Sequence, residues 1–223
     1  MPTVLGSASH PQFERFRDLT SRMRDLVLIE GIVAQPFSDP ALPYFAALSD
    51  ESREEMLRHF EIFLLIVSRA SYEGLDISKS TRRLSLDFLR EAGLQPAPDL
   101  LEHLEDDDHL AAYNHRQQIV FLTPNHFRLM SYSIEDLYCR PWPMLFQRSE
   151  QIEKVLVSRA LEFGRGLHTK TLVHSDVPPH LLTEINGPEK RTGTAQSKVY
   201  SPVFRNGRPA GFVAVNRARL SPS

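Results

Sequence analysis

The first half of the chain carries the hydrophobic spacing of helices. Apolar residues recur every three or four positions, which places them on one face of a helix. Ser49 or Asp50 can cap one of these helices. The stretch Ile62 to Val67 of this helix is apolar on every side, so we expect the helix at the centre of a bundle. The pattern predicts helices over residues 11–33, 42–48, 50–74 and 79–92.

After residue 110 the pattern changes to that of strands. Short segments rich in β-branched and aromatic residues favour strands, and they lie at residues 119–122, 167–174, 199–204 and 212–215. Asn206-Gly207 separates the last two and is the strongest short-range signal for a hairpin turn. We therefore expect an α+β fold. A helical bundle over residues 1–98 would precede an antiparallel sheet with flanking helices over residues 99–219, buried on one face.

Four segments of the second half resemble the PAS family of sensory domains in their order and spacing. IVFLTPN at 119–125 is similar to the family's second strand and the asparagine after it, and YSIEDL at 132–137 is similar to its G-Y-S-x-E-E-L segment. The helix expected over 149–163 resembles the family's long connecting helix, and YSPVFRNGRPAGFV at 200–213 resembles its last two strands. The resemblance implies a domain for binding and signalling. Between 176 and 196 the chain is longer than the family's usual connection, and we expect a loop or a lid there.

The resemblance places a pocket where short helices pack over the sheet. Aromatic and methionine side chains gather in the segment assigned to those helices, and two more come from the sheet. The candidate ligand-binding residues are Phe127, Met130, Tyr132, Trp142, Met144, Phe146, Tyr200 and Phe212. The alternative is that these side chains fill the core, and the domain would then be an interaction module without a ligand.

Few residues point to a cofactor. Cys139 lies about three positions before the reactive cysteine of flavin-binding members of the family, so we expect an inert thiol. His168 and His174 would share one face of a strand and could ligate a metal or haem, although hydrogen-bonded histidines are the simpler interpretation. The acidic run at 106–109 matches no metal loop, and we interpret it as a solvated linker. The sequence predicts no metal site and leaves the cofactor unknown.

Composition narrows the class of protein. The 223 residues include 26 basic and 28 acidic side chains, a net charge of −2, which argues against nucleic acid or an anionic membrane as partner. The single cysteine permits no intrachain disulfide, and the first residues lack the apolar run of a signal peptide, so we expect a cytoplasmic protein. No apolar run approaches the ~20 residues of a membrane span.

Together these patterns predict a sensory or regulatory protein and not an enzyme. The sequence has no nucleophile elbow, phosphate loop or redox cysteine pair. The alternative is a small enzyme that uses His168, His174 or Asp176 as acid or base in the cavity.

We expect three kinds of partner: a second copy of the chain, a small molecule and a partner protein. The stripe Leu100, Leu101 and Leu104 precedes the sheet and predicts a homodimer contact, because the resemblance implies pairing through this helix. A small molecule would bind the PAS-like domain, and the output would pass through the N-terminal helices or a partner protein.

Overall fold

The computed structural model describes residues 11–174 and 177–221 and has an α+β fold, as expected. The N-terminal helical elements are α1 (Pro11–Ile29), η1 (Asp39–Ala41), α2 (Leu42–Ala47), α3 (Asp50–Tyr72), α4 (Thr81–Glu91) and η2 (Pro98–Glu102). The later ones are α5 (His126–Leu129), α6 (Ile134–Cys139), η3 (Trp142–Met144) and α7 (Glu150–Gly164). The strands are β1 (Gln95–Pro96), β2 (His109–Asn114), β3 (Ile119–Leu122), β4 (Phe146–Gln147), β5 (Leu172–Val173), β6 (His180–Glu184), β7 (Thr192–Arg205) and β8 (Arg208–Leu220).

The helices begin and end where local chemistry favours it. The Ser49 side chain accepts a hydrogen bond from the Ser52 backbone N–H at 3.2 Å and caps α3. Gly74 follows this helix with a φ of 76°, a left-handed conformation that glycine adopts at little cost. Helix α1 stops at Ile29, earlier than predicted, and Gly31 turns the chain with a φ of 72°.

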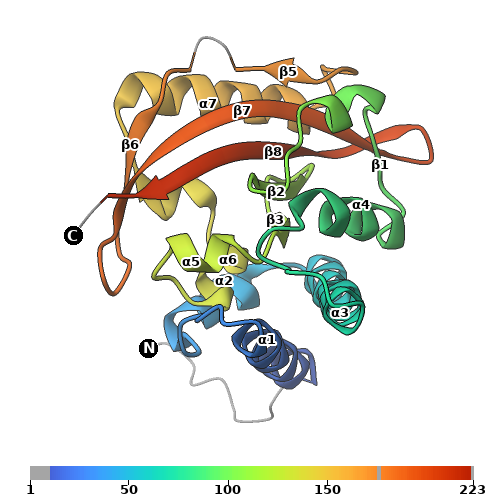
Figure 1. Ribbon diagram of the computed structural model, residues 1–223, viewed down its shortest axis with the longest axis vertical. Helices are drawn as coiled ribbons and strands as arrows, with labels where there is room; N and C mark the ends of the chain where they lie inside the picture. Colours follow the sequence, from blue (N-terminus) through green and yellow to red (C-terminus); the bar gives the residue numbers. More distant parts are fainter. Residues whose placement is uncertain (1–10, 175–176, 222–223) are drawn as a thin grey trace, which may run out of the picture.

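The sheet is antiparallel throughout and follows the order β3-β2-β8-β7-β6-β4, with β1 and β5 also paired to β7. Its longest pair is the β7–β8 hairpin, which forms the curved centre of the molecule in Figure 1. Arg205 pairs with Arg208, so Asn206 and Gly207 form a two-residue turn. Their φ values of 52° and 72° match a turn with two left-handed residues, and the predicted hairpin is confirmed.

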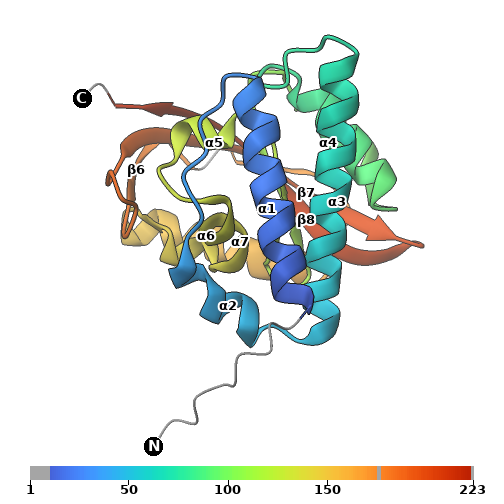
Figure 2. The same cartoon turned by 90° about the horizontal axis from the view of Figure 1, so that it is seen from below.

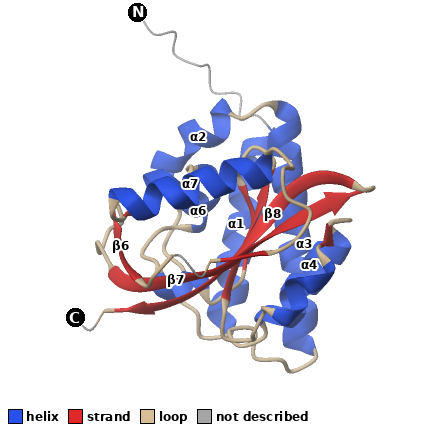
Figure 3. Cartoon of the chain, turned by 90° about the horizontal axis from the view of Figure 1, so that it is seen from above, coloured by secondary structure: helices blue, strands red, loops and turns tan. Residues whose placement is uncertain are grey.

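Both faces of this sheet are covered, which corrects the expected one-sided sheet. Alternate residues of β8 point to opposite faces: Phe212 and Ala214 join the apolar cluster under α7, whereas Val213 and Val215 join the core shared with the N-terminal helices. Figure 1 shows α7 on one side of the β7–β8 hairpin and α3 and α4 on the other. In Figure 3, viewed from above, α7 crosses the strands on the near side.

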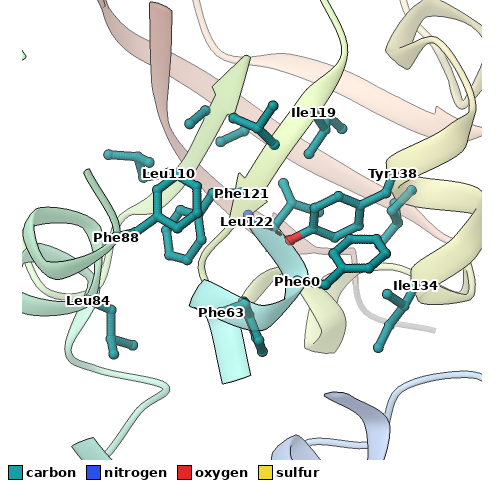
Figure 4. Packing of buried hydrophobic residues seen from close by; sticks show 14 of the residues in the cluster. Phe60, Phe63, Leu84, Phe88, Leu110, Ile119, Phe121, Leu122, Ile134 and Tyr138 are labelled. Atoms are coloured by element: carbon teal, nitrogen blue, oxygen red, sulfur yellow. Dashed lines mark hydrogen bonds between the residues drawn. The ribbon is translucent and has the colours of Figure 1, made fainter. Parts of the chain in front are cut away.

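The N-terminal helices share a core with the sheet. Phe121 of β3 stacks on Phe88 of α4, with ring centroids 4.3 Å apart (Figure 4). Tyr138 of α6 meets the Phe60 ring of α3 edge-on at 4.8 Å, and its hydroxyl accepts a hydrogen bond from the Leu122 N–H at 3.1 Å. The hydrophobic cluster therefore continues across the boundary that the sequence placed at residue 98.

Three segments differ from their predicted structure. The strand predicted at 167–174 contains only the two paired residues of β5. The segment predicted as a loop at 176–196 contains β6, which pairs with both β4 and β7. The end of the region expected to form a helical bundle, residues 1–98, contributes β1, whose Gln95 pairs with Phe204.

The predicted dimer stripe also needs correction. Leu100 and Leu104 are fully buried within the chain, in the cluster shared by the helices and the sheet, and Leu101 is half-buried. They belong to η2 and the turn after it, not to a long helix. The amphipathic spacing of these leucines thus reflects packing inside one chain, and Leu100 and Leu104 are unavailable to a second copy.

Candidate functional site

A cavity of about 110 Å³ lies between the inner face of the sheet and the short helices. Four alanines of the sheet border it: Ala111, Ala195, Ala214 and Ala218. Because a methyl group replaces a larger side chain at each position, the sheet leaves space that its neighbours do not fill. Helices α5, α6 and α7 and the segment around η3 close the opposite side.

The structure brings five of the eight predicted pocket residues to this cavity, namely Met130, Trp142, Phe146, Tyr200 and Phe212. The other three are not among its lining residues. Phe127 is buried in the shared core, and Met144 is 45% exposed on the surface. The structure therefore does not place these three residues at this cavity.

Tyr132, the third misplaced candidate, has a structural role. Its hydroxyl donates to the Leu145 carbonyl at 2.6 Å and accepts from the Asn186 N–H at 3.1 Å. These bonds join α6's leading segment to the start of β4 and to the turn after β6. Tyr132 therefore fixes the position of the cavity wall without facing the cavity.

Three aromatic rings form the sheet side of the cavity. Tyr113 of β2 stacks on Phe212 of β8 with ring centroids 4.9 Å apart and planes 15° from parallel. Tyr200 of β7 lies 5.3 Å from Phe212. Among the described residues neither tyrosine hydroxyl has a hydrogen-bond partner, although buried phenols usually find one.

Arg148 supplies a positive charge to the same cavity. Its guanidinium carbon lies 4.8 Å from the centre of the Trp142 ring, in a cation–π contact. Its Nε and Nη1 atoms are buried and have no hydrogen-bond partner among the described residues. Burial lowers the pKa of Arg148, but an arginine stays charged in proteins.

Tyr113, Tyr200 and Arg148 act as hydrogen-bond donors to this cavity at neutral pH. Burial raises the pKa of Tyr113 to about 12 and also raises the pKa of Tyr200, so both phenols keep their protons. Arg148 lies close enough to influence the pKa of each tyrosine. Converging donors within apolar walls are typical of a site that binds and orients a small molecule.

Sequence reasoning missed Tyr113, Arg148 and the alanines. A usable signal was present in β8, where Ala214, Asn216 and Ala218 occupy every second position, and only Val213 and Val215 of the alternating residues face the core. Small or polar residues at every second position of a central strand indicate space on that face. Arg148 is a single cation after an aromatic stretch, and the sequence alone gives no sign that it is buried.

The predicted alternative sites have other partners. His168 stacks on Phe163 at 4.4 Å and its Nε2 lies 2.9 Å from Glu162, whereas His174 contacts Arg159 and meets Tyr200 edge-on. Asp176 lies outside the described residues. Over residues 11–174 and 177–221, no cluster of three or more His, Cys, Asp or Glu side chains is arranged to hold a metal ion.

Cys139 is buried, and so is Asp108 of the acidic run at 106–109. Burial raises the pKa of the Cys139 thiol, which therefore stays protonated and unreactive at neutral pH. Asp108 is fully buried, and its carboxylate lies 2.5 Å from Lys198 Nζ and 3.5 Å from Arg217. The interpretation of 106–109 as a solvated linker is wrong for Asp108, which ties the start of β2 to β7 and β8.

No protein-family model matches the chain, and no curated protein is significantly similar to it. Of the helices formed by residues 11–174 and 177–221, none combines the length and the apolar character needed to cross a membrane. A functional proposal therefore depends on the cavity and on the elements that surround it.

Proposed function

We propose that the chain is a sensory or regulatory protein. Its C-terminal, PAS-like part binds a small molecule in the cavity, and its N-terminal helices pass the bound state on. One observation carries the proposal: aromatic walls and unpaired hydrogen-bond donors converge on an unfilled space.

The position of the four PAS-like segments supports this class of protein. The IVFLTPN segment forms β3, and Asn125 at its end is the N-cap residue of α5. The YSIEDL segment forms α6, with Ser133 capping it through a 3.1 Å bond from the Asp136 N–H. The last two segments form α7 and the β7–β8 hairpin. These helices, strands and turns are compatible with the proposed class of domain.

An ion pair offers a route from the cavity to the N-terminal helices. Arg24 of α1 lies 2.7 Å from Glu135 of α6, and the Glu135 side chain is completely buried. Figure 2 shows these two helices next to each other. Helix α6 also places Leu137 at the cavity, so a ligand that moves α6 would change the surroundings of α1.

This link gives a prediction about stability. Arg24→Met should lower the free energy of unfolding by about 3–5 kcal/mol, because it leaves the buried Glu135 carboxylate without a counter-charge. The double variant Arg24→Met/Glu135→Met should recover most of that loss, since no buried charge remains. Urea denaturation of both variants measures the difference. Equal losses in the single and double variants would mean that the pair does not hold α1 to α6.

The proposed ligand can be sought in the protein as purified from cells. The melting temperature should fall after the protein is unfolded, dialysed and refolded, because a bound ligand stabilises the folded state. A ligand at 100 times its Kd adds about 2.7 kcal/mol, and for a chain of this size 1 kcal/mol shifts Tm by roughly 2–4 °C. Native mass spectrometry would show the ligand itself.

A matched pair of variants ties any such ligand to the cavity. Ala214→Leu fills part of the space and should remove the difference between purified and refolded protein, whereas Ala47→Leu, on an exposed position of α2, should keep it. Identical melting curves before and after refolding, with no bound mass, would instead favour an interaction module without a ligand.

A further inference from the structure

The cavity has one uncompensated charge. Arg148 forms no ion pair with any acidic side chain among the described residues, and two of its nitrogens are buried without hydrogen-bond partners. By contrast, Arg24 and Arg140, which are also largely buried, each lie 2.7 Å from a carboxylate oxygen. Arg148 is therefore set apart by its lack of an acceptor, and not only by its burial.

Such an arrangement is costly in an empty protein. A buried guanidinium that has lost its water needs acceptors for its N–H groups. The Trp142 ring stabilises the charge through its face, but it offers no lone pair to Nε or Nη1. The acceptors can come from a ligand that enters the cavity bordered by Arg148.

The chemistry of the walls restricts that ligand to a single negative charge. Arg148 is the one arginine or lysine among the lining residues, and the two histidines there, His126 and His180, both have their pKa lowered by burial and are neutral. One guanidinium matches one carboxylate, which it can bind through two parallel hydrogen bonds. The hydroxyls of Tyr113 and Tyr200 can donate to further oxygen atoms.

The size of the cavity restricts the ligand further. A cavity of about 150 Å³ holds a benzene molecule of six carbons, so 110 Å³ has room for about four to six non-hydrogen atoms. The alanines and Phe212 offer apolar surface to a short carbon chain. A carboxylate with one to three further carbons satisfies both the charge and the volume.

We propose that the cavity binds a short-chain monocarboxylate, whose carboxylate pairs with Arg148 and whose carbon chain lies against the alanine-lined face of the sheet. This inference rests on the proposed function and names the class of its ligand. It also assigns Arg148 as the residue that selects an anion over a neutral molecule of the same shape.

Propionate and its neutral analogue propionamide test the selection at constant ionic strength. Propionate should raise the Tm of refolded wild-type protein more than propionamide does. Arg148→Met, which keeps the length of the side chain, should weaken propionate binding about 10- to 100-fold in calorimetric titration, the loss expected for hydrogen bonds to a charged group. Arg165→Met, at an exposed arginine after α7, should bind as wild type does.

A second measurement needs no ligand. Without any carboxylate, Arg148→Met should have a higher Tm than refolded wild-type protein, because it removes a partly buried charge that has no carboxylate and whose Nε and Nη1 have no hydrogen-bond acceptor. A lower Tm for this variant would show that Arg148 is already compensated and would overturn the inference.

The outcomes separate the two proposals. Equal binding of propionate and propionamide, or unchanged propionate binding by Arg148→Met, would overturn the carboxylate assignment and leave ligand binding in place. Tighter binding of inorganic phosphate than of propionate would overturn it as well. If no probe binds and the purified protein carries no ligand, the proposed function fails together with this inference.

Discussion

Lowering the pH from 6.5 to 4.5 is expected to remove about 7 kcal/mol of stability from this protein, which is comparable to the whole stability of an ordinary domain. Three buried histidines are responsible. Burial lowers the pKa of His59 and His126 to about 3 and the pKa of His109 to about 4. His126 borders the cavity and meets the His109 ring edge-on at 5.1 Å, so protonation would place two positive charges side by side.

The sign follows from the protons bound in each state. Unfolded histidines have a pKa near 6.5, so below that pH the unfolded chain binds protons that the folded protein does not. Stability is therefore complete above pH 6.5 and falls as the pH decreases. Each histidine contributes about 1.4 kcal/mol per pH unit until its folded-state pKa is reached, near 3 to 4. Carboxylates titrate mostly below pH 4.5, so the histidines dominate the window from 6.5 to 4.5.

His59 offers a direct check. Neither of its ring nitrogens has a hydrogen-bond partner among the described residues, and its ring lies 5.6 Å from Phe88. His59→Leu should reduce the slope of stability against pH by one third and raise stability at pH 5 by about 2 kcal/mol. The exposed His115, substituted by Gln, is the matched control and should leave the slope unchanged. A His59→Leu slope equal to that of wild type would show that His59 titrates normally in the folded state.

Local chemistry explains which parts of the fold could be predicted from the sequence. The Asn206-Gly207 turn and the Ser49 cap depend on the residues at those positions and their immediate neighbours, so the sequence carries the complete signal. The α+β class follows from the change of hydrophobic period near residue 110.

The mispredicted parts depend on residues far apart in the chain. Strand β6 lies in a segment rich in proline and glycine, and it exists because β7 and β4 pair with it. Asp108 can be buried because Lys198 and Arg217 pair with it from strands that lie 90 and 109 residues later in the chain. The spacing of Leu100 and Leu104 predicts one buried face, but it does not say whether the same chain or a second copy covers that face.

The residues of the candidate site likewise include some that the sequence could predict and one that it could not. Aromatic clustering was sufficient to find Trp142, Tyr200 and Phe212, because large rings near a sheet are rarely outside a core. Arg148 could be identified only from the structure, because what distinguishes it is the absence of hydrogen-bond acceptors around its side chain. A hydrogen-bond donor without a partner leaves no pattern in a sequence.

Gly211→Ala is expected to cost more than about 4 kcal/mol or to prevent folding, a loss that marks a severe steric conflict. A Cβ atom at this position of β8 would lie 1.9 Å from the Tyr113 carbonyl oxygen and 2.9 Å from Asn114 Cα, and both are backbone atoms of β2. Gly211 also has a φ of 155°, which L residues rarely adopt.

Gly207→Ala is the comparison, because its φ of 72° is also unfavourable for alanine but no atom lies within 4 Å of the added Cβ. It should cost only about 1–2 kcal/mol, the price of one left-handed residue. The difference between the two free energies of unfolding isolates the close approach of β8 to β2. Equal costs would mean that β2 moves aside, and Tyr113 would move with it. A folded Gly211→Ala protein should then bind the cavity ligand more weakly, because the ring that lines the cavity is displaced, whereas Gly207→Ala should bind as wild type does.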